Sequence, residues 1–282
     1  MEGGQDLSIA LIAGQGILPV EIARKLSELQ PSTLVIALRD DPETLKPYAS
    51  RLVHMRIPNL GRGVREVKAF GADRVIMAGR IPKRIIFSLT LLLPLLFDPL
   101  SRRVLKNSLR DDHSLLGSIV KALEDEGLTV IPYWQILPEF IAGEGKLSAR
   151  SPTEQESRDA EYGREVLSVI LPCSFGQGVC VAGGAVVAVE AMEGTDKMIQ
   201  RAGTLARRGV VVKMMKSGQD MRYDLPTVGP QTLENMRGSG LTCLAVEAGK
   251  TLILEPEKFF VLAEKYDIAV WGISNAQEIC CR

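Results

Sequence analysis

The chain is poor in the side chains from which zinc centres are built. It has 282 residues but only two histidines, His54 and His113, and five cysteines. The cysteines stand at positions 173, 180, 243, 280 and 281, and neither they nor the histidines have the paired spacing of zinc ligands. The sequence therefore argues against a zinc site and fits structural thiols in a reducing compartment.

The chain also lacks an excess of charge of either sign. Lys and Arg number 34, as do Asp and Glu, so the formal net charge is zero at pH 7. Proteins that bind nucleic acids or anionic membrane surfaces commonly use an overall positive field, which this chain does not have. We therefore expect no nucleic-acid partner, and any anionic ligand must be recognised by a local group of cations.

No hydrophobic run is long enough to cross a bilayer. The most apolar segment, residues 85–100, is interrupted by Pro94 and falls short of the about 20 apolar residues that a membrane-spanning helix needs. This segment is either a buried core segment or an apolar surface for acyl chains. Residues 1–6 lack the basic start and the apolar centre of a secretory signal, so we expect a cytoplasmic protein.

In the first half of the chain, short apolar runs alternate with helical patterns. A buried strand is predicted over residues 7–13, and a turn that contains Gly14 and Gly16 joins it to a helix over residues 19–29. Further strands are expected at 34–38, 52–57, 74–78 and 128–132, and helices at 61–70 and 114–126. Such alternation favours a parallel sheet with right-handed crossovers. We therefore predict an α/β fold that begins with a Rossmann-like domain over residues 1–132.

The sequence pattern of the second half of the chain predicts a mixed α/β domain over residues 133–282. We expect this domain to be catalytic. Thr153 and Glu156 form a capping-box pattern at the start of a helix over residues 153–170. Gly183 and Gly184 fit the turn of a hairpin. The hairpin strands are expected at 177–181 and 185–191, other strands at 210–214 and 243–247, and helices at 197–208, 231–240 and 257–266.

Glycines that directly follow the first strand allow a ligand to approach the backbone closely. Gly14 and Gly16 precede a helix whose N-terminus offers free N–H groups to a phosphate. A dinucleotide fingerprint needs a third glycine where this chain has Pro19, so the match is partial. Because Asp40 and Asp41 follow the second strand, a nicotinamide-binding protein remains an alternative. A tight turn in any doubly wound sheet explains the glycines equally well.

The densest group of charged side chains lies at residues 213–224, which read KMMKSGQDMRYD and precede a turn rich in Pro and Gly at 225–230. Asp220 and Asp224 can hold a hard divalent cation through oxygen. The cations of the segment, which can neutralise phosphate oxygens, are Lys213, Lys216 and Arg222. This combination favours phosphate chemistry, and a solvated charged loop is the alternative.

A third aspartate, Asp196, follows a predicted strand and precedes a helix. Because the ends of strands gather catalytic groups, Asp196 can converge with the two aspartates of the charged segment. Three carboxylates suit Mg²⁺ or Mn²⁺ better than Zn²⁺. Alternatively, Thr195 or Asp196 caps the helix expected from residue 197. Glu247, at the end of another predicted strand, is a further candidate.

Five segments of the chain resemble those of one known family. They read AGQGILP (13–19), LRDDHSLL (109–116), EAMEGTDKMI (190–199), KMMKSGQDMRYDLPTVGP (213–230) and AVEAGKTLIL (245–254). The fourth is long and unusual in composition, so it is the most specific of the five. On these segments the chain resembles, over nearly its whole length, the LpxI-type UDP-2,3-diacylglucosamine diphosphatases of lipid A biosynthesis.

The resemblance implies a magnesium-dependent hydrolase, with Mn²⁺ as an alternative metal. Such an enzyme splits the pyrophosphate of UDP-2,3-diacylglucosamine into UMP and 2,3-diacylglucosamine 1-phosphate. The resemblance also implies a cytoplasmic homodimer of two-domain chains that hold the lipid between their domains, and it leaves room for peripheral contact with the inner membrane. Residues 85–100 are then expected to contact the acyl chains.

The resemblance further implies roles for particular residues. The predicted metal ligands are Asp196, Asp220 and Asp224, which with Arg222 form the predicted catalytic group. The predicted substrate-binding residues are Gly14, Gly16, Asp112, Thr195, Lys213, Lys216 and Gln219. Family members often carry proline after the second lysine, where this chain has Ser217, so the local loop can differ in shape. A nicotinamide-dependent oxidoreductase and a non-catalytic lipid- or nucleotide-binding regulatory protein remain the alternatives.

Overall fold

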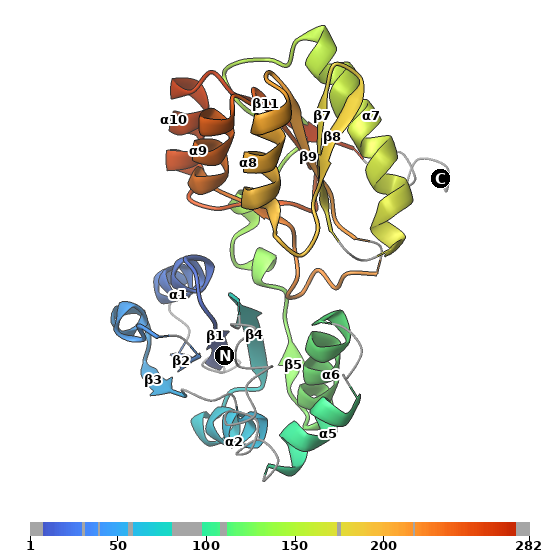
Figure 1. Ribbon diagram of the computed structural model, residues 1–282. Coiled ribbons are helices and arrows are strands. Elements are labelled where there is room, and N and C mark those ends of the chain that lie inside the picture. The colour runs from blue at the N-terminus through green and yellow to red at the C-terminus, as the bar shows by residue number, and fades with distance from the viewer. Residues whose placement is uncertain are drawn as a thin grey trace, which may run out of the picture. The chain divides into compact units, whose positions relative to one another are not determined.

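The chain divides into two compact units. The computed structural model describes residues 8–29, 32–38, 40–55, 59–80, 98–107, 112–173, 176–216 and 218–274. The first unit comprises Met1–Leu137 with Asp220–Tyr223, and the second comprises Pro138–Gln219 with Asp224–Arg282 (Figure 1). The boundary predicted from the sequence lies at residue 132, and part of the charged segment, Asp220–Tyr223, belongs with the first unit. In the described residues, no helix is long and apolar enough to span a bilayer.

The first unit is built on a parallel sheet. Its strands are β1 (Ser8–Ala13), β2 (Ser32–Ala37), β3 (Arg51–His54), β4 (Arg74–Ala78) and β5 (Thr129–Val130). The strand order is β3-β2-β1-β4-β5, and every neighbouring pair runs parallel. This order, with the first strand at the centre, is that of a Rossmann-like half. The predicted fold class of this unit is confirmed.

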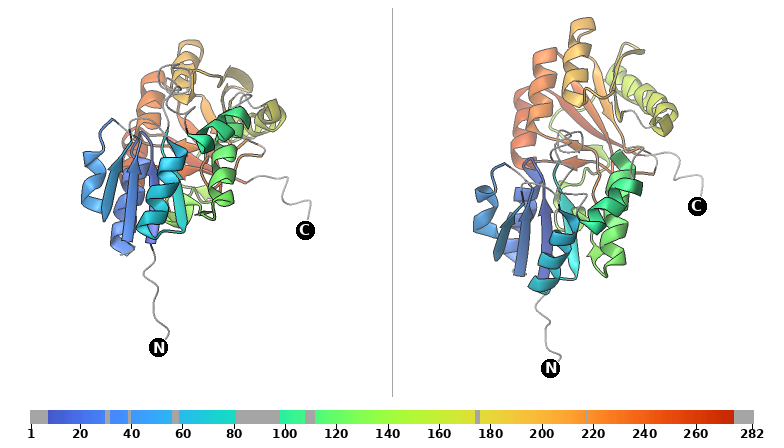
Figure 2. Two further views of the ribbon diagram at one scale, coloured as in Figure 1. Left: turned by 90° about the horizontal axis from the view of Figure 1, so that it is seen from below. Right: turned by 60° about the horizontal axis from the view of Figure 1, so that its bottom comes forward.

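Helices cover both faces of this sheet (Figure 2). They are α1 (Leu18–Leu29), α2 (Leu60–Phe70), α5 (Pro99–Asn107) and α6 (Asp112–Asp125), with 3₁₀ turns η1 (Glu43–Tyr48) and η2 (Tyr133–Gln135). On one face, Val64 of α2 and Leu123 of α6 share a core with Leu34 and Ile36 of β2. On the other face lies α1, which buries Ile22 completely. Because the central strands are covered on both sides, their sequences are apolar without alternation.

The second unit contains a mixed sheet. Its strands are β6 (Gly145–Lys146), β7 (Gly178–Ala182), β8 (Ala185–Val189), β9 (Val210–Lys213), β11 (Cys243–Glu247) and β13 (Ala269–Ile273), in the order β6-β13-β11-β9-β7-β8. β13, β11 and β9 are parallel, and the remaining pairs are antiparallel. A separate parallel pair consists of β10 (Thr227–Val228) and β12 (Leu252–Ile253). The predicted mixed α/β class is confirmed, although the strand β13 was not predicted.

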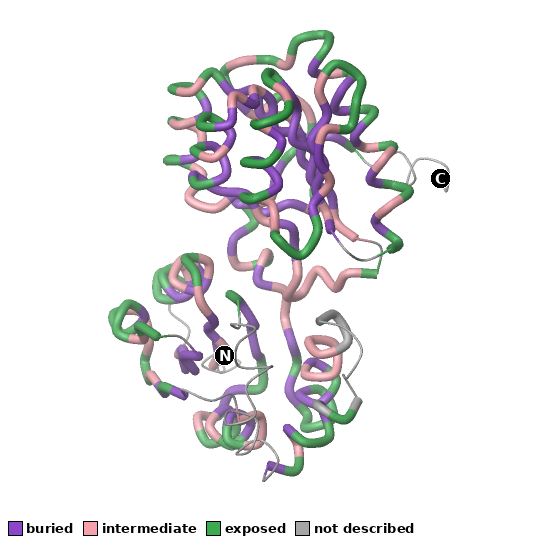
Figure 3. The backbone as a smooth tube through the Cα atoms, viewed as in Figure 1, coloured by how far each residue is buried: buried purple, intermediate pink, exposed green. Residues whose placement is uncertain are grey.

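The helices of the second unit lie on both faces of its sheet. They are α7 (Glu154–Ile170), α8 (Thr195–Leu205), α9 (Pro230–Ser239) and α10 (Pro256–Lys265), with 3₁₀ turns η3 (Pro138–Phe140) and η4 (Leu171–Cys173). One core joins Met198 of α8 and Phe259 of α10 to Leu244 of β11, and a second joins Leu167 of α7 to Val212 of β9. Figure 3 accordingly shows the central strands β7, β9 and β11 largely buried and the outward sides of the helices exposed.

The hairpin between β7 and β8 is fixed by a buried aspartate. Gly183 and Gly184 have φ angles of 60° and 78°, which a two-residue hairpin turn requires and which glycine adopts without strain. Asp159 of α7, only 1% exposed, accepts the N–H groups of both glycines at 2.8 Å. The turn predicted from the two glycines is therefore confirmed, and its amides are paired with a helix that precedes it in the chain.

The start of α7 is held by a network centred on Glu156. The predicted capping box is present, because Thr153 and Glu156 each accept the other's backbone N–H through their side chains. Arg150 donates to both carboxylate oxygens of Glu156 at 2.8 Å, and the Thr242 hydroxyl donates to Oε1 at 2.6 Å. The network thereby joins the start of the helix to the residue that precedes β11.

Acid is expected to destabilise the second unit through Glu156. Burial alone would raise the pKa of this carboxyl, but hydrogen bonds from Arg150 and Thr153 outweigh burial and lower the pKa from 4.5 to about 2. A carboxyl with a lower pKa in the folded chain contributes stability above its unfolded pKa. We therefore expect about 3 kcal/mol of stability to be lost as the pH falls from about 4.5 to about 2.

Urea unfolding at a series of pH values measures this loss. The Glu156→Gln variant cannot titrate at this position, so its free energy of unfolding should fall less steeply over the same pH range. Identical pH dependence in the wild type and in this variant would contradict the role given to Glu156.

Candidate functional site

The first predicted ligand contact lies at the carboxyl end of β1. Gly14 donates its N–H to the carbonyl of Ala78 at 2.8 Å, and a Cβ at this position would lie 2.7 Å from the carbonyl oxygen of Arg80. Gly16 has a φ angle of 106°, which side-chain-bearing residues rarely adopt. Local backbone geometry therefore explains why both positions are glycine. Their part in substrate binding stays a prediction.

Two residues of the predicted catalytic group belong to the first unit. The carboxylate of Asp220 accepts Nε of Arg222 at 2.9 Å and Nη2 at 2.6 Å, and it also accepts the Arg222 backbone N–H at 2.9 Å. Nη1 of Arg222 donates to Glu124 of α6 at 2.6 Å. Tyr223 packs against the core of the first unit. The residues 220–223 are thus docked on α6.

Asp220 and Arg222 form an ion pair with 2.6 Å between Oδ2 and Nη2. Burial alone would raise the pKa of Asp220, but the hydrogen bonds and the charge of Arg222 outweigh burial, so the pKa is lowered. Hydrogen bonding to Asp220 in turn raises the pKa of Arg222. Both carboxylate oxygens of Asp220 therefore already accept hydrogen bonds from the guanidinium of Arg222.

In the second unit, Thr195 and Asp196 do not cap a helix that begins at residue 197. The helix α8 begins at Thr195, and its N-cap is Gly194, with a φ angle of 84° and no side-chain cap. The Thr195 hydroxyl instead donates to Oε1 of Glu190 at 3.0 Å. Glu190 directly follows β8 and is buried. The capping alternative is wrong, because the Thr195 hydroxyl donates to Glu190 after β8 and does not cap α8.

Lys213 is the last residue of β9 and is only 5% exposed. Its Nζ donates to Oγ1 of Thr195 at 2.9 Å and to the carbonyl of Thr227 at 3.0 Å. Burial lowers the pKa of this ammonium, and the negative charges of Glu190 and Asp196 oppose that shift in part. The structure thus brings Thr195, Asp196 and Lys213 together, and it gives Lys213 two acceptors from its own chain.

We call residues 213–227 the 213–227 loop. Besides the bond between Lys213 and Thr227, Gln219 makes contacts within this loop. Gln219 donates its N–H to the carbonyl of Lys216 at 3.2 Å, in a turn where Gly218 has a φ angle of 81°. Oε1 of Gln219 accepts the Lys216 N–H at 2.7 Å, and its Nε2 donates to Oδ2 of Asp224 at 2.8 Å. Gln219, predicted to bind substrate, therefore orients the carboxylate of Asp224.

The predicted candidate Glu247 holds the start of the same loop. It is the last residue of β11 and is 1% exposed. Its Oε2 accepts the backbone N–H of Met215 at 2.8 Å, and its Oε1 forms an ion pair with Lys250 at 3.3 Å. The carboxylate therefore fixes the direction in which the chain leaves β9.

The predicted metal ligands do not form a ready-made centre within either unit. Asp220 belongs to the first unit, whereas Asp196 and Asp224 belong to the second. Both oxygens of Asp220 accept from Arg222. Over the described ranges, no group of three or more His, Cys, Asp or Glu side chains is arranged to hold a metal ion. The residues of each unit by themselves do not fit the predicted three-carboxylate site.

Some predicted residues lie outside the described part of the chain. Asp112 begins α6, but its side chain is among those not described. Neither backbone nor side chain is described for Ser217 and for residues 81–97, which include most of the predicted acyl-chain contact at 85–100. The predictions for these residues stay predictions.

Three residues of the site were not selected from the sequence, namely Glu190, Thr227 and Glu124. Glu190 occupies the end of a strand, which is the signal that selected Asp196, and it lies in the same resembling segment. Thr227 contributes its backbone carbonyl, which any residue could supply. Glu124 lies 98 positions before its partner Arg222, so no local pattern could connect the two.

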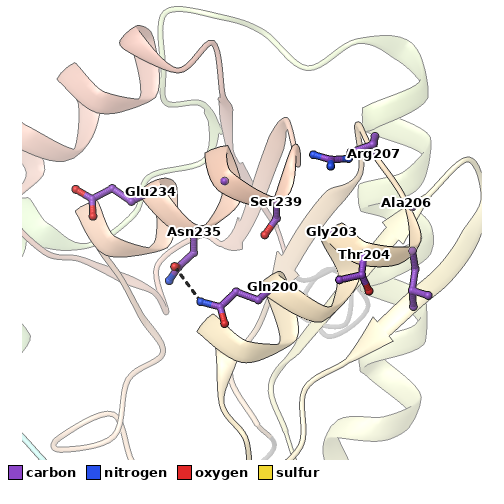
Figure 4. A pocket seen from close by; sticks show the side chains of 10 residues that line it. Gln200, Gly203, Thr204, Ala206, Arg207, Glu234, Asn235 and Ser239 are labelled. Atoms are coloured by element: carbon purple, nitrogen blue, oxygen red, sulfur yellow. Dashed lines mark hydrogen bonds between the residues drawn. The ribbon is translucent and has the colours of Figure 1, made fainter.

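A groove of about 690 Å³ lies between α8 and α9 (Figure 4). It is lined by Gln200, Gly203, Thr204, Leu205, Ala206, Arg207, Glu234, Asn235, Gly238 and Ser239. Nε2 of Gln200 donates to Oδ1 of Asn235 at 3.4 Å. The groove contains no predicted site residue and follows the later part of α8, whereas Thr195 begins that helix.

One solved structure that this chain matches is only distantly similar. The structure of AnUbiX (PadA1) in complex with FMN and dimethylallyl pyrophosphate is 14% identical and covers 46% of this chain and 81% of its own, with a TM-score of 0.25. At that score the similarity carries no argument about fold or function.

Two family models and one curated relative match most of the chain. The family described as the LpxI N-terminal domain matches residues 8–140, and that described as the LpxI C-terminal domain matches residues 143–271. The UDP-2,3-diacylglucosamine pyrophosphatase LpxI of Caulobacter vibrioides is 30% identical over 280 aligned residues, which cover 94% of this chain and 97% of the relative. The two-part architecture and these matches agree, and the chain belongs to the LpxI family.

Proposed function

We propose that the protein hydrolyses the pyrophosphate bond of UDP-2,3-diacylglucosamine and releases UMP and 2,3-diacylglucosamine 1-phosphate. The observation that supports this most strongly is the match of both units to LpxI domains, together with a relative of that activity aligned over 94% of the chain. Family membership makes the chain a diphosphatase. The identity of the substrate and of the products is our proposal.

The chemistry of the reaction suits the residues of the 213–227 loop. In the hydrolysis, the oxygen of water bonds to one phosphorus, the bridging P–O bond breaks, and two phosphate monoesters result. Negative charge develops on the phosphoryl and leaving oxygens, so cations and hydrogen-bond donors lower the barrier. Lys216 and Arg222 of the loop are cations of the required kind.

A carboxylate that orients the attacking water is the second requirement. Asp224 is our candidate, because the amide of Gln219 fixes the position of its Oδ2. Asp220 is a weaker candidate for direct contact with water, since both of its oxygens accept from Arg222. We infer that Asp220 acts chiefly by positioning the guanidinium.

Dependence on Mg²⁺, with Mn²⁺ as a substitute, is retained in the proposal from the family resemblance. The test is incubation of the full-length protein with UDP-2,3-diacylglucosamine and Mg²⁺, followed by mass spectrometry of the products. We expect UMP and 2,3-diacylglucosamine 1-phosphate in equal amounts, no release in the presence of a chelator, and recovery when Mg²⁺ or Mn²⁺ is added in excess. Unchanged turnover with the chelator would contradict metal dependence, and intact substrate under all conditions would contradict the proposed function.

The same incubation separates the two alternative functions. An absorbance change at the nicotinamide band would favour an oxidoreductase, although Asp40, which would hold the ribose, accepts a hydrogen bond from Gln15 at 3.1 Å. Binding of the lipid nucleotide without release of UMP would favour a regulatory protein. The predicted cytoplasmic location, homodimer and peripheral membrane contact stay predictions.

A further inference from the structure

Four polar groups of the second unit form a connected chain of hydrogen bonds. It runs from Glu190, after β8, to the hydroxyl of Thr195 at 3.0 Å, then to Nζ of Lys213 at 2.9 Å, and from there to the carbonyl of Thr227 at 3.0 Å. Its last two members are the first and last residues of the 213–227 loop. The chain of bonds therefore closes the loop at its base.

Glu190 sets the donor-to-acceptor direction of every hydrogen bond in this series. A carboxylate only accepts, so the Thr195 hydroxyl must donate to it, and the lone pairs of that hydroxyl are left to accept from Lys213. An ammonium only donates, so its next bond goes to the carbonyl of Thr227. Each bond thus has one allowed direction.

The sequence makes room for Glu190 at a cost in stability. A Cβ at position 178 would lie 2.8 Å from Oε2 of Glu190, so the glycine there admits the carboxylate. Oε2 is buried and has no hydrogen-bond partner among the described residues. A buried carboxylate with an unpaired oxygen is destabilising in itself, although the charge of Lys213 compensates it in part. Stability alone therefore does not explain this glutamate.

We propose that Glu190 is a positioning residue for the diphosphatase reaction, acting through Thr195 to hold Lys213 on Thr227 and so to fix the base of the 213–227 loop. The inference rests on the proposed function for its effect on turnover. Lys213 is then a clamp of the loop that carries Asp220, Arg222 and Asp224, and no contact between Glu190 and substrate is required.

The test combines hydrogen exchange of the loop amides with turnover. Thr195→Val keeps the shape of the side chain but removes the hydroxyl, and Glu190→Gln keeps the shape but removes the charge. Because a hydrogen bond to a charged group is lost or weakened, we expect amide exchange in the peptide 214–226 to rise by about 10–100-fold in both variants. Turnover of UDP-2,3-diacylglucosamine should fall over the same range, through kcat more than through KM.

Two further variants distinguish a clamp from a general loss of stability. Thr195→Ser retains the hydroxyl, so it should restore the slow exchange of the loop. Glu193→Gln makes the same change three residues later. The carboxylate of Glu193 pairs with Arg201 near the surface at 2.7 Å. This variant should leave loop exchange and turnover as in the wild type.

Two results would overturn the proposal. One is wild-type exchange of the loop in both Thr195→Val and Glu190→Gln. The other is an equal rise of exchange in β7, α8 and the loop, because that pattern indicates a role in the fold at large. If the wild-type protein fails to turn over the substrate, the proposed function fails, whereas the exchange comparison still decides whether the clamp exists.

Discussion

Replacement of Asp224 by asparagine is expected to lower the turnover of UDP-2,3-diacylglucosamine by about 100-fold or more, because an amide can neither accept a proton from water nor carry the charge of a carboxylate. The amide oxygen of asparagine can still accept from Gln219, which now donates to Oδ2 at 2.8 Å. The local structure should therefore persist. Initial rates of UMP release at saturating substrate measure the effect.

A matched control separates loss of chemistry from loss of charge. Asp73→Asn makes the same change at an exposed position outside the predicted site, and its rate should equal that of the wild type. Both variants should unfold in urea within about 0.5 kcal/mol of the wild type. If Asp224→Asn releases UMP within about threefold of the wild-type rate, Asp224 is not the residue that orients water.

The Arg150→Met change is expected to destabilise the second unit by about 3–5 kcal/mol, because it leaves a buried carboxylate without its cation. The side chain of Glu156 is 7% exposed and receives two hydrogen bonds from Arg150. Methionine can fill similar space but cannot donate. The free energy of unfolding in urea at neutral pH measures the loss.

Arg158→Met on α7 is the control for this change. Arg158 pairs with Glu154 at 2.5 Å, but both side chains are well exposed, at 61% and 85%. Solvent screens such a pair, so its loss should change stability by less than about 1 kcal/mol. Equal destabilisation by the two substitutions would contradict the buried network at the start of α7.

Much of the fold could be predicted from local patterns because those patterns determine it directly. The capping box of Thr153 and Glu156 and the glycine pair 183–184 each specify a backbone geometry within a few residues, and both are confirmed. The strand Cys243–Glu247 was predicted with its observed bounds, since it is a short apolar run ended by a charge.

Elements defined by tertiary contacts could not be predicted in this way. β10 and β12 are two residues long, too short for any periodicity, and together they form a small sheet. β13 was not predicted, although its apolar run after α10 is a usable signal in an alternating α/β chain. The start of α8 was placed two residues late, with Thr195 or Asp196 considered as its cap, whereas the Thr195 hydroxyl binds Glu190.

The charged segment 213–224 illustrates what sequence can and cannot supply for the site. Its density of cations and carboxylates selected the segment as a candidate, and the segment lies within the range that the LpxI C-terminal domain matches. Some of the contacts that distinguish the roles of its residues join distant positions. Arg222 and Glu124, for example, are 98 residues apart. Partners of this kind depend on the folded chain, so sequence left the roles of Asp220 and Asp224 undivided.

The most direct test of the central claim is phosphorus NMR of purified full-length protein mixed with UDP-2,3-diacylglucosamine and Mg²⁺. The account predicts that the two diphosphate resonances disappear while two monophosphate resonances, those of UMP and of the diacylated sugar 1-phosphate, grow in equal amounts. It also predicts that the Asp224→Asn protein leaves the diphosphate resonances in place over the same time. Persistence of the diphosphate resonances with the wild-type protein, or equal hydrolysis by both proteins, would contradict it.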